Sequence, residues 1–212
     1  MKLKAKRIIR FAFKKVYMVL YFDTETTSLH PGQICQLSYL MQTKKSVEAK
    51  NFFFTVDSVD FSAFMVHGFS VEKLKMLSCG RRFKDYFEEI EKDFSNADVL
   101  ISHNTAFDIS FMRAEYERLN KIFVSKETFC TMKKSVPILK LLRSSGRGYK
   151  YPKLSELCAY LSVSDGVIKS ACTEFFGADA GYHDARFDTC AVFLSMNEYF
   201  NRGAFKEVRI LL

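Results

Sequence analysis

Apolar residues in the first quarter of the chain fall in short continuous runs that are typical of buried strands. The first run, residues 16–22, is rich in β-branched and aromatic side chains and leads directly into Asp23. Two further runs, 34–42 and 51–56, are separated by the Lys-rich connection 43–50. Because these connections are short, we expect the three strands to form an antiparallel meander.

The middle of the chain changes to a helical spacing of apolar residues. Residues 81–96 have this spacing, and residues 98–102 follow as a short apolar strand, an order that predicts a crossover to a parallel neighbour. The next helix is expected to begin after Asn104 as its N-cap. Asp108 then lies in the first turns of a helix beside the carboxyl end of a strand, where open α/β sheets build their sites.

The last third of the chain repeats the alternation. We expect a strand at 127–131, short amphipathic helices at 137–144 and 153–163, and a final helix with Asp184 as its N-cap. The loop RSSGRGYKYPK, residues 143–153, carries bases and two tyrosines. It could contact a nucleic-acid backbone, or it could be a plain surface turn. The whole pattern predicts an α/β fold with a mixed sheet of about five strands, the Asp23 strand in its middle and helices on both faces.

Composition favours one globular domain. The chain has 212 residues, of which 48% are hydrophobic, and no apolar run is long enough to span a bilayer. Its six cysteines are scattered without a CxxC pair, and no secretory signal is evident, so a reducing, cytoplasmic setting is expected.

The positive charge is concentrated at the amino terminus. Of the formal net charge of +8, residues 1–15 contribute seven bases and no acid, so the rest of the chain carries +1. We therefore expect a basic extension at 1–15 and one domain at 16–212. The extension could add sequence-independent attraction to phosphates, or it could be a disordered arm or a transit-like segment.

Two carboxylates follow the first predicted strand. If the extended backbone continues through Glu25, the side chains of Asp23 and Glu25 emerge from one face of the sheet. Like charges in an apolar setting repel, and a hard divalent cation would remove that conflict. A solvated turn without a metal is the alternative for this stretch taken alone.

Three motifs considered together point to a family. They are D-x-E at 23–25, HNTAFD ending at Asp108, and HDARFD, which holds His183 and Asp188. In this order and spacing they resemble the DEDD superfamily of 3′-to-5′ exonucleases, and most closely the epsilon-like proofreading subunits of bacterial DNA polymerase III. The tyrosine subtype would need Tyr at position 184, which is Asp here, so the chain is similar to the histidine subtype.

The resemblance covers residues 16–202 and implies a ribonuclease H-like fold with a two-metal phosphodiesterase site. Asp23 would bridge two Mg²⁺ ions, for which Mn²⁺ would substitute. Glu25 and Asp188 would complete the nucleophile-side ion site, and Asp108 would hold the ion beside the leaving group. His183 would act as general base.

The resemblance also implies contacts to the substrate. Thr24, Glu25 and Thr26 would surround the 3′-terminal nucleotide. Leu29 would act as an apolar wedge between the last two bases, and His67 would lie over the terminal nucleotide, unless it is a loop histidine with no such role.

Other positions are less informative. Related proteins often carry Glu where this chain has Ser62, a departure from the family pattern at a position that concerns the grip on the terminal sugar. His103 and Asn104 are interpreted as structural, and His30 has no role that we can argue.

Three functions remain open from the sequence. The first is a 3′-to-5′ exonuclease that acts on DNA 3′ ends in proofreading or repair, with a DNA polymerase as a separate partner chain. The second is an RNA-trimming enzyme of the same fold, similar to ribonuclease T or oligoribonuclease. The third is a non-catalytic binding module, which the intact set of motif residues argues against. A membrane partner is not expected.

Overall fold

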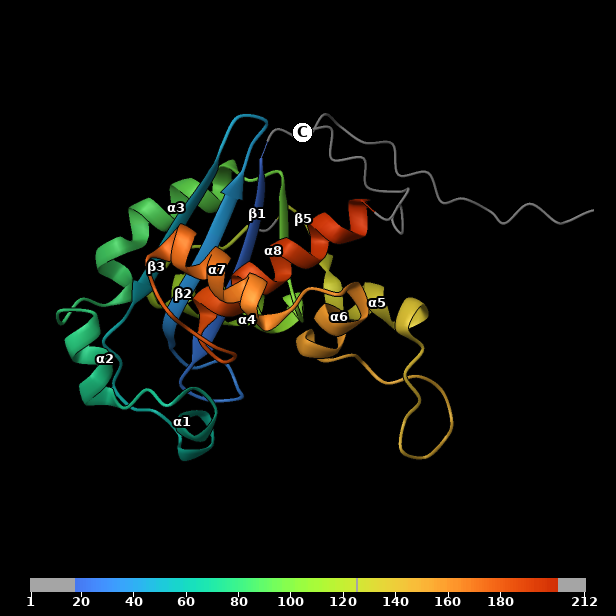
Figure 1. The fold of residues 1–212 in the computed structure, drawn as a ribbon. Helices are drawn as coiled ribbons and strands as arrows, with labels where there is room; N and C mark the ends of the chain where they lie inside the picture. The colour runs from blue at the N-terminus through green and yellow to red at the C-terminus, as the bar shows by residue number, and fades with distance from the viewer. Residues whose placement is uncertain (1–17, 125, 202–212) are drawn as a thin grey trace, which may run out of the picture.

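A mixed five-stranded sheet forms the centre of the computed structural model, which describes residues 18–124 and 126–201 (Figure 1). The strands are β1 (Val19–Thr26), β2 (Ile34–Gln42), β3 (Val47–Phe53), β4 (Val99–Ser102) and β5 (Glu127–Cys130). Their order across the sheet is β3-β2-β1-β4-β5. Strands β1, β2 and β3 pair antiparallel, whereas β4 pairs parallel to both β1 and β5. The predicted meander, crossover and central position of the Asp23 strand are therefore confirmed.

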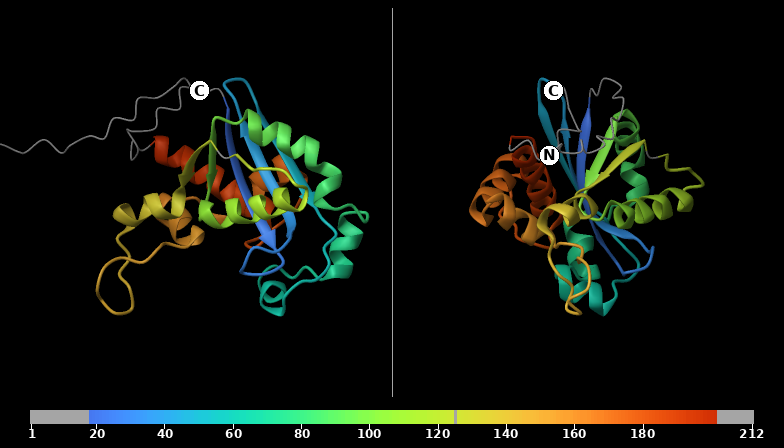
Figure 2. Two further views of the ribbon diagram at one scale, coloured as in Figure 1. Left: turned by 180° about the vertical axis from the view of Figure 1, so that it is seen from behind. Right: turned by 90° about the vertical axis from the view of Figure 1, so that its right-hand side faces the viewer.

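Helices cover both faces of the sheet (Figures 1 and 2). They are α1 (Phe61–His67), α2 (Val71–Leu77), α3 (Phe87–Asn96), α4 (Thr105–Arg118), α5 (Thr131–Leu139), α6 (Leu154–Leu161), α7 (Asp165–Phe176) and α8 (Ala185–Asn201), with a 3₁₀ turn, η1 (Phe83–Tyr86), before α3. Among the described residues, no helix is long and apolar enough to cross a membrane.

Strand β1 supplies the core on both sides because successive side chains alternate between the faces of a sheet. Leu20 and Phe22 pack into a cluster with residues of α3 and α4. Val19 and Tyr21 pack into a second cluster with residues of α6, α7 and α8. By the same alternation, Asp23 and Glu25 face the side that α8 covers, while Thr24 faces α4.

Two predicted elements are displaced in the structure. Strand β3 begins at Val47, inside the segment expected to be a connection, because it is an edge strand whose polar side chains find partners: Lys50 pairs with Glu89 and Asp93. The predicted helix 137–144 is wrong. Helix α5 ends at Leu139, and Pro137 lies inside it rather than at its start.

Three helices were not predicted, namely α1, α2 and α7. Helix α7 carries signals that could have identified it: the Ser164 side chain accepts a hydrogen bond from the backbone N–H of Val167, and Gly177 caps the other end in a left-handed conformation. Helix α1 has no buried residue, so it lacks the apolar stripe by which a helix is usually recognised.

The functional motifs meet at one end of the sheet. The parallel strands β1 and β4 both end there, helix α4 begins immediately after β4, and helix α8 packs on β1 and β2. The β1–β2 pairing shifts register between Glu25 and Thr26, an irregularity that re-aims side chains at the strand end. The basic extension predicted at 1–15 lies outside the described residues.

Candidate active site

Three carboxylates converge at the end of β1. One oxygen from each of Asp23, Glu25 and Asp188 lies within 4.8 Å of the others. Asp23 and Glu25 are two residues apart on β1. Asp188 lies in the first turn of α8, on the face that packs against that strand. The D-x-E spacing thus places both side chains on one face, as predicted, and the donor set suits a divalent cation.

Burial puts this cluster under electrostatic strain. Burial and the neighbouring carboxylates, chiefly Asp188, raise the pKa values of Asp23 and Glu25 well above their usual range. Burial likewise raises the pKa of Asp188 to about 7. The Oδ2 atom of Asp188 accepts a 3.0 Å hydrogen bond from the backbone N–H of His183, but Oδ1 is buried without a hydrogen-bond partner. An unsatisfied buried oxygen among like charges is the arrangement that a bound cation would stabilise.

Asp108 approaches from the opposite face of the sheet and is oriented by two hydroxyls. Thr24 donates to its Oδ1 at 2.8 Å, and Ser102, at the end of β4, donates to its Oδ2 at 2.9 Å. Burial raises the pKa of Asp108 to about 7, although these two hydrogen bonds oppose the rise. Asp108 is not one of the three clustered carboxylates, yet its charge contributes to the raised pKa values of Asp23, Glu25 and Asp188.

His183 occupies a strained turn immediately before α8. Its φ is 68°, in the left-handed region that non-glycine residues seldom adopt, and such strain is often found at functional sites. The side chain is exposed and lines a cleft of about 550 Å³ together with Asp23 and Asp188. The remaining lining residues are His103, Lys153, Leu154, Ser155 and Tyr182.

The start of α8 is tied to strand β2 through Gln36. This side chain is fully buried, donates to Asp184 at 3.0 Å and accepts from the backbone N–H of Ala185 at 3.1 Å. Asp184 also accepts the N–H of Arg186, as expected of an N-cap, and forms an ion pair with its guanidinium. Burial would raise the pKa of Asp184, but the hydrogen bonds from Arg186 and Gln36 hold it below its usual value.

The loop after β1 presents Leu29 to solvent. The backbone N–H of Thr27 donates to the carbonyl of Gln33, and Ser28 donates to the carbonyl of His30. Gly32 permits this tight turn, because an added Cβ would lie 2.7 Å from Oγ1 of Thr27. Leu29 is 75% exposed, so its side chain is available for contact with a ligand.

His67, at the end of α1, is tied to the end of β1. Its Nδ1 accepts the backbone N–H of Phe69, which leaves the proton on Nε2 for donation to the carbonyl of Thr26 at 3.1 Å. Burial lowers the pKa of His67, so the neutral ring is favoured. Both ring nitrogens are therefore bound to the backbone, and the ring stacks on Phe69.

Two interpretations made from sequence need refinement. Asn104 stands at the N-cap position of α4, but it does so in a left-handed conformation with φ of 76°, and its side chain makes no capping hydrogen bond. Thr24 and Thr26 are buried, and their hydroxyls are committed to Asp108 and to the carbonyl of Ser28. His103 is structural as expected, because its ring nitrogens contact Thr131 and the carbonyl of Pro152.

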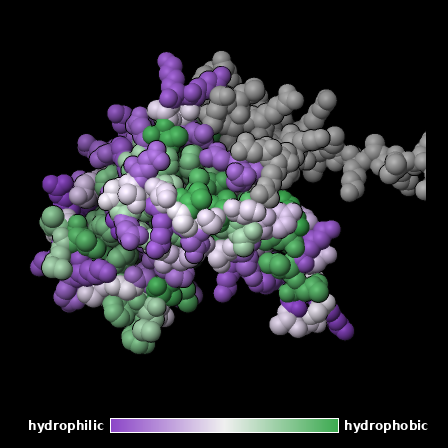
Figure 3. Space-filling view, viewed as in Figure 1, coloured by the Kyte–Doolittle hydropathy of each residue, from purple (hydrophilic) through white to green (hydrophobic). Residues whose placement is uncertain are grey.

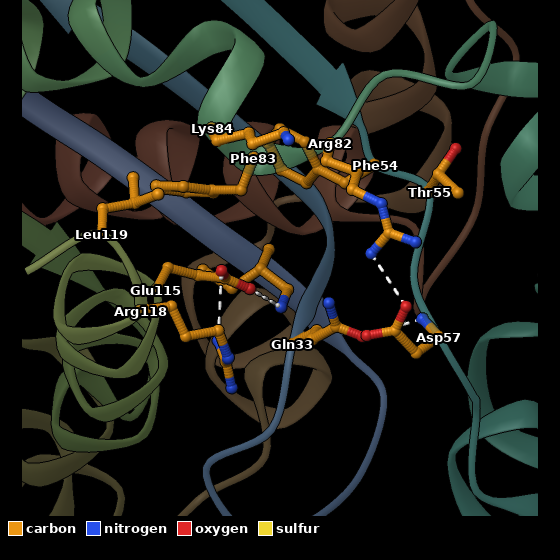
Figure 4. Close-up of a pocket in the computed structure, with 11 residues that line it drawn as sticks. Gln33, Phe54, Thr55, Asp57, Arg82, Phe83, Lys84, Glu115, Arg118 and Leu119 are labelled. Atoms are coloured by element: carbon orange, nitrogen blue, oxygen red, sulfur yellow. Dashed lines mark hydrogen bonds and ion pairs between the residues drawn. The ribbon is translucent and has the colours of Figure 1, made fainter.

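A second, smaller cleft lies away from the carboxylate cluster (Figure 4). Its volume is about 230 Å³, and four of the charged side chains that line it form two ion pairs: Arg82 with Asp57, and Arg118 with Glu115. Glu115 also accepts the backbone N–H of Ile34. These contacts hold the start of β2 against α4, so this cleft is a structural junction.

Comparison with known proteins identifies the sequence family. The sequence model of the Exonuclease family matches residues 20–166. The epsilon subunit of DNA polymerase III from Rickettsia felis is 30% identical over 152 residues, which cover 69% of this chain and 63% of that relative. The epsilon subunit from Escherichia coli is 26% identical over 160 residues, with 69% of this chain and 61% of that relative covered. The chain thus spans somewhat less than two thirds of the length of these relatives.

Solved structures share the fold. Exonuclease I from Methylocaldum szegediense superposes with a TM-score of 0.66 at 15% identity, over 89% of this chain and 41% of that chain. Escherichia coli exonuclease I in complex with a 5cy-dT13 oligonucleotide gives a TM-score of 0.65, also at 15% identity and with the same shares covered. The common architecture is ribonuclease H-like, as the motifs implied. With its sequence match over more than half its length and this shared fold, the chain belongs to the exonuclease family.

Proposed function

We propose that this chain is a metal-dependent 3′-to-5′ exonuclease that removes nucleoside monophosphates from DNA 3′ ends. One observation carries the proposal. Asp23, Glu25 and Asp188 converge in a buried cluster that contains an unpaired oxygen and opens on a cleft beside His183. Membership in the exonuclease family supplies the reaction class to which this arrangement is suited.

The residues present fit divalent cations. All donors are hard carboxylate oxygens, and the buried Oδ1 of Asp188 has no partner from the protein. We assign one ion to Asp23, Glu25 and Asp188, and a second to Asp23 together with Asp108. Magnesium ions are proposed, with manganese as a substitute. Bound there, such ions would activate the attacking water, neutralise charge at the scissile phosphate and stabilise the leaving alkoxide.

His183 acts as the general base in this proposal. An exposed imidazole on the rim of the cleft can accept the proton of the attacking water and return it to solvent. The backbone N–H of His183 holds Asp188, so the turn before α8 fixes the base and a carboxylate together. Thr24 and Ser102 orient Asp108, so that its carboxylate needs little rearrangement when substrate binds.

The apolar surface around Leu29 suits the terminal bases. Helix α1 exposes Phe61, Met65 and Val66, and it is joined to the loop that carries Leu29 by the hydrogen bond from the N–H of Asp60 to the carbonyl of Thr27. We propose that Leu29 separates the last two bases and that His67 lies close to the terminal nucleotide. Because Thr24 and Thr26 use their hydroxyls internally, their contact with substrate would come from the backbone.

DNA is the favoured substrate, and RNA is the alternative. Relatives at 26–30% identity are subunits of a DNA polymerase, and a structural neighbour is named as a complex with an oligonucleotide of dT. By the same relatedness, we propose a DNA polymerase carried on a separate chain as a partner, and a cytoplasmic location.

The deciding experiment is degradation of matched single-stranded DNA and RNA oligomers with Mg²⁺ or with EDTA. We expect nucleoside monophosphates to appear from the 3′ end of DNA, and a 3′ phosphate to block the reaction. Activity should be faster on single strands and mismatched ends than on paired ends, because a paired end must first fray. Cleavage of circular single-stranded DNA would contradict the end-gripping site, and faster loss of RNA would favour the alternative.

Two variants test the assigned roles. Asp23→Ala should abolish cleavage while the fold is retained, and near-normal activity would exclude the carboxylate site.

His183→Ala should keep metal binding but lose about 10²–10⁴-fold in turnover, with partial recovery at higher pH as hydroxide replaces the base. Collapse of metal binding in His183→Ala would instead make this residue a ligand.

A further inference from the structure

The segment between helices α5 and α6, residues 140–153, projects from the body of the protein and is called the basic arm below. Figure 1 shows it as the long yellow and orange loop at the lower right, and the view from behind in Figure 2 shows the same projection. In the space-filling view it stands out from the body as a separate lobe (Figure 3). Residues 142–149 are all exposed.

The basic arm is a hairpin held by its own hydrogen bonds, although it is not part of a β-strand. Leu142 and Tyr149 form an antiparallel bridge, and the N–H of Lys150 donates to the carbonyl of Leu141 at 2.8 Å. Arg143 contributes twice: its N–H donates to the carbonyl of Gly148 at 3.1 Å, and its side-chain Nε donates to that of Tyr149 at 3.1 Å. An exposed segment with its own hydrogen bonds can hold side chains in fixed positions.

Charge is distributed unevenly around this hairpin. Residues 128–155 contain seven bases and no acid. Since residues 1–15 hold another seven and the net charge is +8, all other segments together carry −6. Within the described part of the arm, Lys150 is ion-paired with Glu156, whereas Lys140 and Arg147 are exposed and form no ion pair, and the exposed Lys153 binds Glu156 through its backbone N–H.

The foot of the basic arm forms part of the catalytic cleft. The carbonyl of Pro152, which is buried, accepts a 3.0 Å hydrogen bond from Nε2 of His103, and His103 directly follows strand β4. Lys153 lines the cleft together with Asp23, His183 and Asp188. One end of the arm therefore lies at the cleft that two of the clustered carboxylates line.

Aromatic rings accompany the bases. Tyr149 is 43% exposed and Tyr151 is 58% exposed, four and two residues before Lys153 in the sequence. Alternating bases and exposed rings are what proteins use to bind single-stranded nucleic acids, because the bases attract phosphates and every nucleobase can stack on a ring.

The geometry points to the basic arm as a binding surface for the single strand that leads to the 3′ end, on the 5′ side of the scissile phosphate. This inference rests on the function proposed above and deepens it by assigning the path of the substrate. Figure 1 shows helix α1 below the end of β1 and the arm to the right of it. The terminal nucleotide would enter between them, with the upstream phosphates along Arg147 and Lys140 and the bases on Tyr149 and Tyr151.

The test uses direct binding as well as turnover. Fluorescence anisotropy with a labelled single strand of about 20 nucleotides in EDTA compares the whole wild-type chain with Arg147→Glu. Arg147 is exposed, so this change should leave the fold intact. We expect a severalfold weaker affinity and a salt slope that is flatter by about 0.7 for each lost phosphate contact. Tyr151→Leu should weaken binding without changing the slope, because stacking carries no charge.

The matched control is Lys92→Glu, the same change of charge on the exposed face of α3. Equal affinities of Arg147→Glu and Lys92→Glu for the strand would overturn the inference and leave the arm to another class of partner.

In turnover measurements, Arg147→Glu should raise KM for long strands at unchanged kcat. It should leave hydrolysis of the p-nitrophenyl ester of thymidine 5′-monophosphate unaffected, since that substrate has no upstream strand. An equal loss on the ester would show that Arg147 acts on the site itself.

These readouts separate the two proposals. If the wild-type chain cleaves neither strand nor ester, the exonuclease proposal fails, while the anisotropy comparison still decides whether the basic arm binds a single strand.

Discussion

Asp188 shows most directly why the carboxylate cluster needs a cation. One of its oxygens is held by the backbone N–H of His183, and the other is buried without a partner. Burial and the charges of Asp184 and Asp108 raise its pKa from 3.8 to about 7. Between these two pH values, Asp188 in the metal-free protein keeps its proton in the folded state, whereas the unfolded state has already released it.

The sign of the pH dependence follows from that difference. Because the folded state binds more protons, the free energy of unfolding falls as pH rises from about 4 to about 7 and stays low above that range. Added Mg²⁺ should therefore raise the melting temperature more at about pH 8 than at about pH 5, where protons compete for the carboxylates. Thermal melts with Mg²⁺ and with EDTA at both pH values measure this effect.

Asp188→Asn is the informative variant for this prediction. It should raise the melting temperature of the metal-free protein at the higher pH and reduce the stabilisation by Mg²⁺. Glu88→Gln, on the exposed face of α3, is the control and should behave like the wild type. Equal stabilisation by Mg²⁺ in wild type and Asp188→Asn would argue against a metal at this carboxylate.

At the scale of residues, sequence could predict the carboxylates but not the partners that orient them. The D-x-E spacing on a strand places Asp23 and Glu25 on one face by geometry alone. That Thr24 would donate to Asp108 depends on a contact between residues 84 positions apart, which no local pattern encodes. The neutral tautomer of His67 likewise depends on the carbonyl of a distant strand end.

At the scale of elements, the link between β2 and α8 sets the position of the helix that carries Asp188. Gln36 makes both hydrogen bonds of this link from a fully buried position, and each would be lost in Gln36→Leu. We expect this variant to lose about 1–3 kcal/mol in stability, because the N–H of Ala185 and the Asp184 carboxylate lose a buried partner. We also expect a fall in kcat, with KM for a strand less affected, since His183 and Asp188 would be displaced together.

Gln42→Leu is the matched control for that prediction. Gln42 lies on the same strand and accepts a 2.8 Å hydrogen bond from the hydroxyl of Tyr21, at the end of β2 away from the carboxylates. It should cost stability without a specific loss of kcat. Denaturant unfolding and steady-state kinetics on both variants make the comparison, and a similar fall in kcat for the two would remove the positioning role from Gln36.

Elements were predicted well where apolar residues form a continuous or regularly spaced run, and poorly where exposed polar residues interrupt it. Strand β2 matched its predicted bounds, 34–42, because all but its last residue are buried and the run is continuous. Strand β3 was placed too late because Glu48 and Lys50 belong to an edge strand. The basic arm was partly predicted as a helix because residues 137–144 are amphipathic, but Lys140 adopts a left-handed conformation that ends α5.

At the scale of the whole molecule, the order of elements was enough to predict the sheet. A meander followed by helix-strand crossovers places β1 between an antiparallel and a parallel neighbour, which brings the ends of β1 and β4 to the same edge. Of the two positive regions, only one could be predicted from the sequence. The seven bases of residues 1–15 stand out as a run, whereas the bases of residues 128–155 matter because the fold places one of them, Lys153, in the cleft.

The last prediction concerns these two positive regions. Deletion of residues 2–15 removes the seven bases of the extension and retains every residue that the structure describes. If the extension adds phosphate contacts of its own, strand binding should weaken at low salt, and the salt slope should flatten by about 0.7 per lost contact, while the rate at saturating substrate is unchanged. Because the basic arm would still guide the strand, the loss should disappear at high salt, where the electrostatic contribution is screened. Combining the deletion with Arg147→Glu should give additive losses, since the two regions would contact different phosphates. Loss of folding on deletion would show instead that the extension is part of the domain, and unchanged affinity at every salt concentration would leave it without a role in binding nucleic acid.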